Sequence, residues 1–218
     1  VKRCEKVGIA VRQFLLTADA SQRDLMETIE EINRDESIHG CLMFRPLPKQ
    51  LDEQAACAAF SPAKDVDGIT AGSLAAVFSG SGAGYPPCTA RACLEILDYY
   101  GYELKGKRAV VVGRSLVIGK PVSMLLLGRH ATVTICHTRT ADLPAECRRA
   151  DVLIAAAGKA GVIGADCLSP GQVILDVGIN ADGDGNLVGD VDFAAAEPVA
   201  GAITPVPGGV GAVTTSVL

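Results

Sequence analysis

The 218-residue sequence lacks several features that would place it in a large class of proteins. No apolar run approaches the roughly twenty residues that a membrane-spanning helix requires, so we expect no membrane partner. It has no tract of Lys and Arg, and the formal net charge is −5, which argues against nucleic acid as a partner. No secretory signal peptide is recognisable. Because Val1 is not a start methionine, we expect the chain to begin inside a longer protein.

The eight cysteines are scattered along the chain and form no C-x-x-C pair. The two nearest neighbours, Cys88 and Cys93, have a spacing that suits neither a zinc site nor a redox motif. Several cysteines lie in apolar segments, where a free thiol behaves as a small hydrophobic group. The histidines, His39, His130 and His137, are too dispersed to indicate a metal site. We therefore predict reduced cysteines, a cytoplasmic protein and no bound metal.

The most informative stretch of what is present runs from Arg108 to Pro121. Four apolar residues, Ala109 to Val112, lead into Gly113, as expected for a buried parallel strand that ends in a tight turn. A helical pattern then begins at Gly119, and its first turn would offer unpaired N–H groups to a phosphate. The motif departs from G-x-G-x-x-G because Ser115 replaces the second glycine. We predict a dinucleotide-binding turn; the alternative is a glycine-bearing turn in some other doubly wound protein.

The residues after a second predicted strand, 132–136, favour NADP over NAD. About twenty residues beyond the glycine turn, an NAD-binding protein places an acid on the ribose. Here the first acid is Asp142. Instead, the strand is followed by His137 and then by Thr138, Arg139 and Thr140, and Arg114 lies in the glycine turn. A guanidinium and a hydroxyl suit the 2′-phosphate of NADP. The alternative interpretation is a solvated basic loop.

Further apolar runs at 151–157 and 172–177 continue the same pattern, with a short helix predicted over 141–150. Alternating strands and helices predict a doubly wound parallel sheet with helices on both faces. Ligands of such sheets gather at the carboxyl ends of the strands. Residues 180–192 are predicted to form a surface turn or hairpin, because their acidic residues lack the spacing of a calcium loop.

The first part of the chain is predicted to be a separate α/β unit that lacks its own beginning. Helices are predicted over 2–7, 20–33 and 50–60, strands over 9–14 and 39–44, a charged turn over 61–68 and a loop over 79–84. A long helix over 88–100 would then lead into the nucleotide-binding half.

Five motifs occur in order along the chain. They are Lys64–Gly68, Pro87–Thr89, Gly113–Ser115 with Gly119 and Pro121, Asp176–Asn180, and Ile203–Gly211. The last is the most specific, because no generic turn requires two prolines and three glycines in so short a run. Together the motifs closely resemble the bifunctional methylenetetrahydrofolate dehydrogenase/methenyltetrahydrofolate cyclohydrolase family, and the resemblance extends through essentially the whole chain.

The resemblance implies an enzyme of one-carbon metabolism and purine biosynthesis. It would oxidise 5,10-methylenetetrahydrofolate with NADP and hydrolyse the methenyl product to 10-formyltetrahydrofolate. The resemblance also implies a cytoplasmic homodimer whose folate site lies in a cleft between two domains. Residues 1–86 would form the folate-binding catalytic domain and residues 87–204 a Rossmann-like NADP-binding domain. Residues 205–218 would form a cleft loop and the start of a helix that returns to the catalytic domain.

The resemblance also implies roles for individual residues. Gly113, Arg114 and Ser115 would line the cofactor phosphates, Thr138 would lie near the adenosine end, and Ile179 would lie beside the nicotinamide. The substrate cleft would include Phe44, Pro46, Pro205, Pro207, Gly208 and Gly209.

Asp67 would hold the folate, since a carboxylate can accept hydrogen bonds from the adjacent N–H donors of a pterin edge. The nearby Asp65 is predicted to lie in a solvated turn.

Two departures from the family concern its catalytic lysine. Lys2 matches only the second lysine of the family's Tyr-Val-x-x-Lys-x-Lys stretch, so the catalytic lysine is expected before Val1 and Lys2 is expected to be a solvated helix residue. Phe44 replaces a glutamine that hydrogen-bonds this lysine, and strand alternation predicts that Arg45 faces the other way. Hydride transfer depends mainly on positioning, whereas water attack needs acid–base catalysis. We therefore expect oxidation to survive the loss of the lysine–glutamine contact and hydrolysis to be impaired by it.

Two alternatives remain open from the sequence. One is another NADP-dependent dehydrogenase of the same fold, such as the shikimate dehydrogenase type, against which the motifs at 64–68 and 205–211 argue. The other is a non-catalytic nucleotide-binding module, which would bind NADP without folate turnover.

Overall fold

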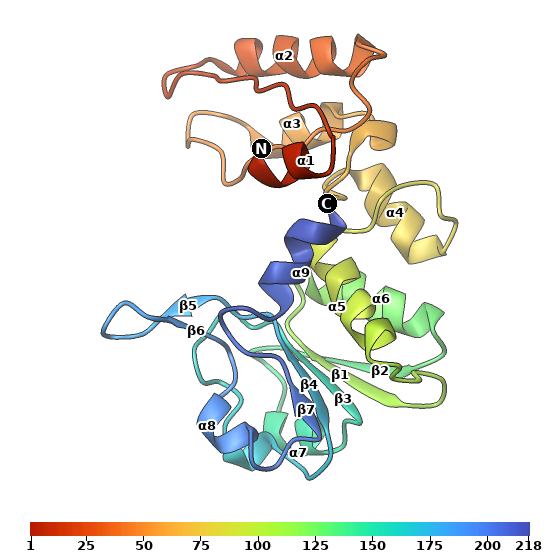
Figure 1. The fold of residues 1–218 in the computed structure, drawn as a ribbon, viewed down its shortest axis with the longest axis vertical. Helices are drawn as coiled ribbons and strands as arrows, with labels where there is room; N and C mark the ends of the chain where they lie inside the picture. The colour runs from red at the N-terminus through yellow and green to blue at the C-terminus, as the bar shows by residue number, and fades with distance from the viewer.

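The computed structural model describes residues 1–218 as an elongated molecule of two units (Figure 1). The amino-terminal unit, residues 1–86, contains helices α1 to α4, and the sheet unit, residues 87–218, contains every strand and the remaining α-helices. The predicted α/β architecture, with a parallel sheet in the second unit, is confirmed. No helix combines the length and the apolar character that a membrane span requires.

A parallel sheet of five strands, in the order β2-β1-β3-β4-β7, forms the centre of the sheet unit. The strands are β1 (Arg108–Val112), β2 (Thr132–Cys136), β3 (Val152–Ala155), β4 (Val173–Asp176) and β7 (Ala202–Ile203). From β1 the chain passes to β2 on one side and then crosses back to β3 on the other. The carboxyl ends of β1 and β3 therefore form the topological switch point, where ligands of doubly wound sheets bind.

Alternate residues of β1 enter two separate cores, so helices cover both faces of the sheet as predicted. Ala109 and Val111 face α5 (Cys88–Tyr99), α6 (Gly119–Gly128) and α9 (Val210–Val217). Val110 and Val112 face α7 (Leu143–Arg148), the 3-10 turn η2 (Ala165–Cys167) and α8 (Phe193–Ala196).

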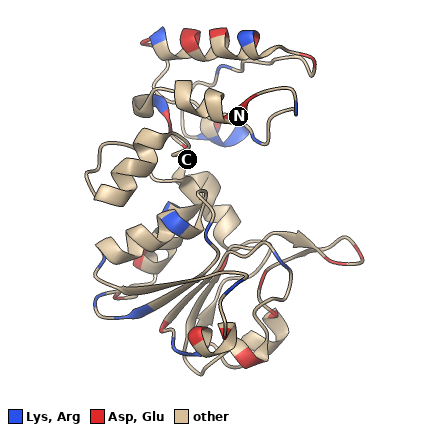
Figure 2. Ribbon diagram, turned by 180° about the vertical axis from the view of Figure 1, so that it is seen from behind, with Lys and Arg blue, Asp and Glu red and all other residues tan.

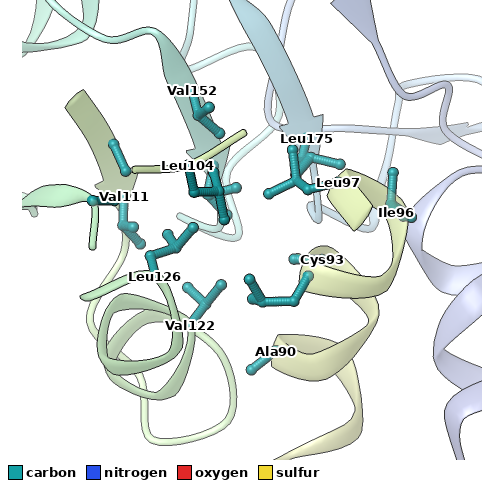
Figure 3. Packing of buried hydrophobic residues seen from close by; sticks show 14 of the residues in the cluster. Ala90, Cys93, Ile96, Leu97, Leu104, Val111, Val122, Leu126, Val152 and Leu175 are labelled. Carbon is teal, nitrogen blue, oxygen red and sulfur yellow. The ribbon is translucent and has the colours of Figure 1, made fainter. Parts of the chain in front are cut away.

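Helix α5 packs closely in the first core because its buried stripe alternates small and large residues. Figure 3 shows Ala90, Cys93 and Leu97 of α5 directed toward Val122 and Leu126 of α6, below the sheet. All five side chains are almost fully buried. The predicted helix over 88–100 is thereby confirmed, and it fixes the position of the segment that precedes it.

The amino-terminal unit is built from α1 (Lys2–Lys6), α2 (Gln22–Arg34), α3 (Glu53–Ala59), the 3-10 turn η1 (Pro62–Lys64) and α4 (Ala71–Ser79). Ser21 and Asp24 form a reciprocal capping box at the start of α2. The predicted apolar stripe of α2, Leu25, Ile29 and Ile32, is buried, while its other faces carry both acidic and basic residues (Figure 2). Helix α4 is an element that the sequence did not predict.

The prediction of strands over residues 9–14 and 39–44 is wrong. Residues 9–14 form no regular structure, and the second segment contributes only one isolated parallel bridge, between Cys41 and Asp65. A strand requires a neighbouring strand for its ladder of hydrogen bonds, and local β-propensity does not supply one. Instead, the Arg12 guanidinium lies over the Phe14 ring and forms ion pairs with acids of α2 and its carboxyl end.

Two further features match their predictions, the hairpin after β4 and the state of the cysteines. β5 (Asn180–Ala181) and β6 (Leu187–Val188) form an antiparallel hairpin that projects from the sheet unit (Figure 1). The eight cysteines are free thiols.

The two units also meet through α9. This helix runs from the sheet toward the amino-terminal unit (Figure 1). The guanidinium of Arg3, on α1, donates hydrogen bonds to the carbonyl oxygen of Ala212, at 3.4 Å, and to the hydroxyl of Thr215.

Candidate functional site

The glycine turn after β1 lies at the switch point of the sheet. Gly113 has φ +138°, and a Cβ placed on it would lie 2.1 Å from the carbonyl oxygen of Ala156, just beyond β3. A Cβ on Gly119 would lie 2.3 Å from the carbonyl oxygen of Gly113. Only glycine allows these backbones to approach so closely, which brings the start of α6 directly against the turn.

The same turn presents a row of unused hydrogen-bond donors. The backbone N–H groups of residues 114 to 117 donate no hydrogen bond within the protein. The hydroxyl of Ser115 accepts from the N–H of Ile118 at 3.2 Å and so fixes the turn. Arg114 and Ser115 are exposed. Free N–H groups at the start of a helix make a site for an anion such as a phosphate.

The loop after β2 lies next to this turn, because Val112 at the end of β1 pairs in register with Cys136 at the end of β2. The N–H of His137 donates to the hydroxyl of Thr140 at 2.9 Å, which closes the loop. Thr138 and Arg139 remain exposed. A hydroxyl and a guanidinium therefore lie beside the glycine turn.

Two buried aspartates organise the loops after β3 and β4. The Asp190 carboxylate accepts hydrogen bonds from the N–H groups of residues 157, 158 and 159 at 2.6 to 2.9 Å. The Asp176 carboxylate accepts from Gly178 and Asp190 at 2.9 Å and from Val191 at 3.0 Å. Burial raises the pKa of Asp176. These contacts leave Ile179 on the outside of the β4 loop, 68% exposed.

The loop after β7, residues 204–209, is held against β4. The Thr204 hydroxyl accepts a hydrogen bond from the Asp176 N–H at 2.9 Å. A Cβ on Gly209 would lie 2.3 Å from the carbonyl oxygen of Pro205, so the loop closes tightly on itself. Pro205, Pro207 and Gly208 are exposed. Because the strands are parallel, this loop lies at the same sheet edge as the glycine turn.

In the amino-terminal unit, Asp67 lies where the two units join. A Cβ on the next residue, Gly68, would lie 2.5 Å from the backbone nitrogen of Pro87. The thiol of Cys88, at the start of α5, donates to the carbonyl oxygen of Val66 at 3.2 Å. The Lys64–Gly68 and Pro87–Thr89 motifs, which are separate in the sequence, are therefore packed together in the structure.

Burial raises the pKa of Asp67 above the ordinary value of an aspartate. The neighbouring Cys88 and the charge of Arg45 act in the opposite direction, while Asp65 adds to the effect of burial. Burial and the neighbouring Asp67 raise the pKa of the Cys88 thiol to about 12, which keeps this thiol neutral.

Arg45 faces Asp67. One of its terminal nitrogens lies 3.8 Å from Oδ2 of Asp67, and the other lies 3.7 Å from Oε1 of Glu53. Phe44 is 85% exposed, and Pro46 is also exposed. The strand on which the predicted orientation of Arg45 rested is absent, because residues 44–46 do not form a strand. Arg45 is nevertheless directed to Asp67 while Phe44 is exposed, so the two side chains do point to different surroundings.

The predicted solvated turn at Asp65 is also wrong. Its side chain is 1% exposed, and its carboxylate accepts from the N–H groups of Ile69 at 2.9 Å and Thr70 at 2.7 Å. Asp65 thus shapes the turn that carries Asp67 and leads into α4.

The structure brings the predicted site residues into two clusters. The first, at the carboxyl edge of the sheet, contains Gly113, Arg114, Ser115, Thr138, Ile179, Pro205, Pro207, Gly208 and Gly209. The second, in the amino-terminal unit, contains Asp67 with Arg45 and Glu53, and Phe44 and Pro46 follow in the chain beside Arg45. No group of three or more His, Cys, Asp or Glu side chains is arranged to hold a metal ion.

Sequence reasoning missed Glu53 and Asp190. The only sequence signal for Glu53 was that it is an acidic residue in the first turn of a helix. Asp190 had no local signal beyond its position after the hairpin, because its role depends on contacts with distant segments.

Family models match both units of the chain. Residues 1–67 match the model described as tetrahydrofolate dehydrogenase/cyclohydrolase, catalytic domain. Residues 87–218 match the model described as tetrahydrofolate dehydrogenase/cyclohydrolase, NAD(P)-binding domain. The "bifunctional protein FolD" of Carboxydothermus hydrogenoformans is 52% identical over 219 residues, which cover 100% of this chain and 76% of that relative.

Solved structures agree with this assignment. The bifunctional FolD enzyme, methylenetetrahydrofolate dehydrogenase/cyclohydrolase, of Campylobacter jejuni superposes with a TM-score of 0.96 at 37% identity and covers 99% of this chain and 77% of that one. The Trypanosoma brucei enzyme, solved in complex with NADP cofactor and an inhibitor, has a TM-score of 0.92 at 35% identity, with 99% and 76% covered. The chain therefore belongs to the tetrahydrofolate dehydrogenase/cyclohydrolase family.

Proposed function

We propose that this protein oxidises 5,10-methylenetetrahydrofolate to 5,10-methenyltetrahydrofolate with NADP, and then hydrolyses that product to 10-formyltetrahydrofolate. Family models that match both units support the two activities. The structural observation that carries the proposal is the glycine turn at the switch point, with its four unused N–H donors. A dinucleotide phosphate is the ligand that such a turn accepts.

The residues present fit NADP. The N–H groups of residues 114–117 would hold the cofactor phosphates, with Gly113, Arg114 and Ser115 lining them. Thr138 would lie near the adenosine, and Arg139 beside it suits a 2′-phosphate. Ile179 would lie beside the nicotinamide. When bound, the cofactor supplies the acceptor of the hydride, and the protein supplies its position.

Asp67 would hold the folate substrate. A half-buried carboxylate can accept two N–H donors from the edge of a pterin ring, and charge-assisted hydrogen bonds of this kind are the stronger ones. Phe44 and Pro46 on one side would complete the cleft, with the loop that carries Pro205, Pro207, Gly208 and Gly209 on the other.

Each part of the chain would have its own task. Residues 1–86 would bind the folate and carry catalysis, and residues 87–204 would bind NADP. Residues 205–218 would form the cleft loop and the helix that leads back to the catalytic domain. Contacts of α9 with both units support this last assignment.

Hydrolysis of the methenyl group needs a proton donor and acceptor of suitable pKa. The family resemblance assigns this role to the family's catalytic lysine, and Phe44 takes the place of the glutamine that contacts it. Since Phe44 offers no hydrogen bond, we expect the ratio of hydrolysis to oxidation to be more sensitive to pH than in a glutamine-bearing relative.

Further expectations rest on the resemblance alone. They are a cytoplasmic location, a homodimer and a supply of one-carbon units to purine biosynthesis. Eight free thiols suit a reducing compartment. Light scattering on the purified protein would test the homodimer.

The experiment for this function follows both reactions with the full-length protein. NADPH formation from methylenetetrahydrofolate reports oxidation, and loss of added methenyltetrahydrofolate reports hydrolysis. Asp67→Asn should raise the KM for the folate about tenfold, roughly 1.4 kcal/mol, and leave the KM for NADP unchanged. The exposed Asp19→Asn is the matched control.

Turnover of shikimate instead of folate would favour the alternative dehydrogenase. NADP binding without folate turnover would favour the non-catalytic module. Either result would refute the proposed function.

A further inference from the structure

One guanidinium links three parts of the amino-terminal unit. Arg45 places one terminal nitrogen 3.8 Å from Oδ2 of Asp67 and the other 3.7 Å from Oε1 of Glu53. The second oxygen of Glu53 accepts a hydrogen bond from the N–H of Leu47 at 3.0 Å. The loop over 44–48, the start of α3 and the turn that carries Asp67 are therefore connected through Arg45.

This connection differs from an ordinary surface ion pair. The Arg45 side chain is 25% exposed, and those of Asp67 and Glu53 are 30% and 39% exposed, so all three are partly removed from water. Charges act on one another more strongly when water is partly excluded. The positive charge of Arg45 lies between the carboxylates of Glu53 and Asp67 and attracts both of them.

We propose that Arg45 is a positioning residue for the folate-holding carboxylate of Asp67, and that it sets the affinity for the folate substrate. The inference rests on the proposed function. Arg45 keeps Asp67 ionised and directs its Oδ2 toward the guanidinium, which leaves Oδ1 for the N–H donors of the pterin. Through Glu53 and Leu47, it also fixes the neighbouring cleft residues.

The groups that face Asp67 are few. Arg45 and Cys88 favour its ionised form, while burial and Asp65 disfavour it. Glu53 faces Arg45 from the other side. Without Arg45, the burial and the Asp65 charge that favour a protonated Asp67 carboxyl would be opposed only by Cys88. A protonated Asp67 accepts fewer hydrogen bonds and binds the pterin edge less well.

The test compares Arg45→Leu and Arg45→Lys with the full-length wild-type enzyme. Arg45→Leu should raise the KM for methylenetetrahydrofolate about tenfold, with kcat within about twofold and the KM for NADP unchanged. The acidic limb of its kcat/KM profile for folate should move to higher pH. Arg45→Lys keeps the charge, so its KM should rise only about threefold, and its acidic limb should move less.

A matched control is Arg12→Leu, because Arg12 also faces two carboxylates of the same unit, those of Glu31 and Asp35, away from Asp67. It should leave the folate KM and the pH profile unchanged. Thermal unfolding of each variant checks its fold. If Arg45→Leu does not fold, Arg45→Lys decides the question against the wild type: its folate KM should rise about threefold with the KM for NADP unchanged, and an unchanged folate KM and pH profile would overturn the inference.

Three results would overturn the inference: an unchanged folate KM and pH profile in a folded Arg45→Leu enzyme, an equal rise in the KM for NADP, or an effect of Arg45→Lys as large as that of Arg45→Leu. In each case the proposed function would still be supported if the wild-type enzyme oxidised methylenetetrahydrofolate. A wild-type enzyme that does not oxidise the folate would refute the proposed function, and this inference would fall with it.

Discussion

The backbone N–H of Asp190 donates a 2.9 Å hydrogen bond to Oδ1 of Asp176, so the two buried acids are directly connected. The carboxylate of Asp190 in turn accepts from three successive N–H groups after β3 and from the side-chain amide of Asn180. One aspartate thus holds the loops after β3 and β4 in a fixed relation. Both loops lie at the sheet edge where the cofactor is expected.

Asp190→Asn should disrupt this arrangement. Each oxygen of the carboxylate faces two donors, so the amide nitrogen of asparagine would meet donors whichever way it turned. We expect the free energy of unfolding to fall by about 3 kcal/mol and the KM for NADP to rise. Chemical denaturation and NADP titration would measure both. Asp192→Asn, at the exposed N-cap of α8, should change neither, because asparagine caps a helix as well as aspartate.

Gly113→Ala should be severe. Its φ of +138° excludes ordinary side chains, and the added methyl group would meet the carbonyl oxygen of Ala156 at 2.1 Å. The free energy of unfolding should fall by about 3 kcal/mol, and NADP binding should weaken as the turn moves away from β3.

Gly128→Ala is the control for this substitution, because a Cβ on Gly128 meets nothing within 4 Å. The free energy of unfolding of the Gly128→Ala variant should equal that of the wild type or exceed it by about 0.5 kcal/mol, as expected for alanine in a helix. Equal stability losses in the two variants would contradict the assigned role of Gly113.

Lys64→Met should destabilise the amino-terminal unit without affecting hydride transfer directly. The ammonium group of Lys64 donates to the carbonyl oxygens of Ile32 at 2.7 Å, Asn33 at 3.0 Å and Asp35 at 2.7 Å, which lie at the carboxyl end of α2. We expect a loss of about 2 kcal/mol in the free energy of unfolding. Lys49→Met removes an exposed lysine from the same unit and should change stability by less than about 0.5 kcal/mol.

The Asp98–Arg129 pair should contribute a pH-dependent part of the stability. The hydrogen bond from Arg129 lowers the pKa of Asp98, so the folded protein binds this proton less readily than the unfolded chain. The contribution is therefore complete above the unfolded pKa of about 3.9 and disappears as pH falls through the lower folded value.

Asp98→Asn should cost about 0.5 to 1 kcal/mol at pH 7, because solvent screens this partly exposed pair. Its unfolding curve should converge with that of the wild type at acidic pH. A difference that grew as the pH fell would contradict this assignment.

Much of the sheet unit could be predicted because its signals are local. A continuous apolar run such as Val110–Val112, followed by glycine, describes a parallel strand buried on both faces. The segments around β3 and β4 repeat that pattern, so strand and turn could be assigned in order. The positions of Gly113 and Ser115 at the sheet edge follow from the same pattern.

The amino-terminal unit was harder to predict because its conformation depends on contacts between residues that are far apart in the sequence. Residues 9–14 have β-propensity but no neighbouring strand, so Arg12 and Phe14 pack on each other beside α2 instead. The segment around Asp65 has the composition of a solvated turn. The Asp65 carboxylate is nevertheless buried and accepts hydrogen bonds from the N–H groups of Ile69 and Thr70. The contact between Arg45 and Asp67 likewise joins residues that no local pattern connects.

The hydrogen bonds from Arg3 to α9 span 209 and 212 residues of sequence. During synthesis α1 therefore leaves the ribosome long before its partner exists. The sheet unit can collapse around α5 first, and α1 docks only when α9 has been made. Closing so long a loop is entropically costly and slow, so α1 should attach to α9 late in folding.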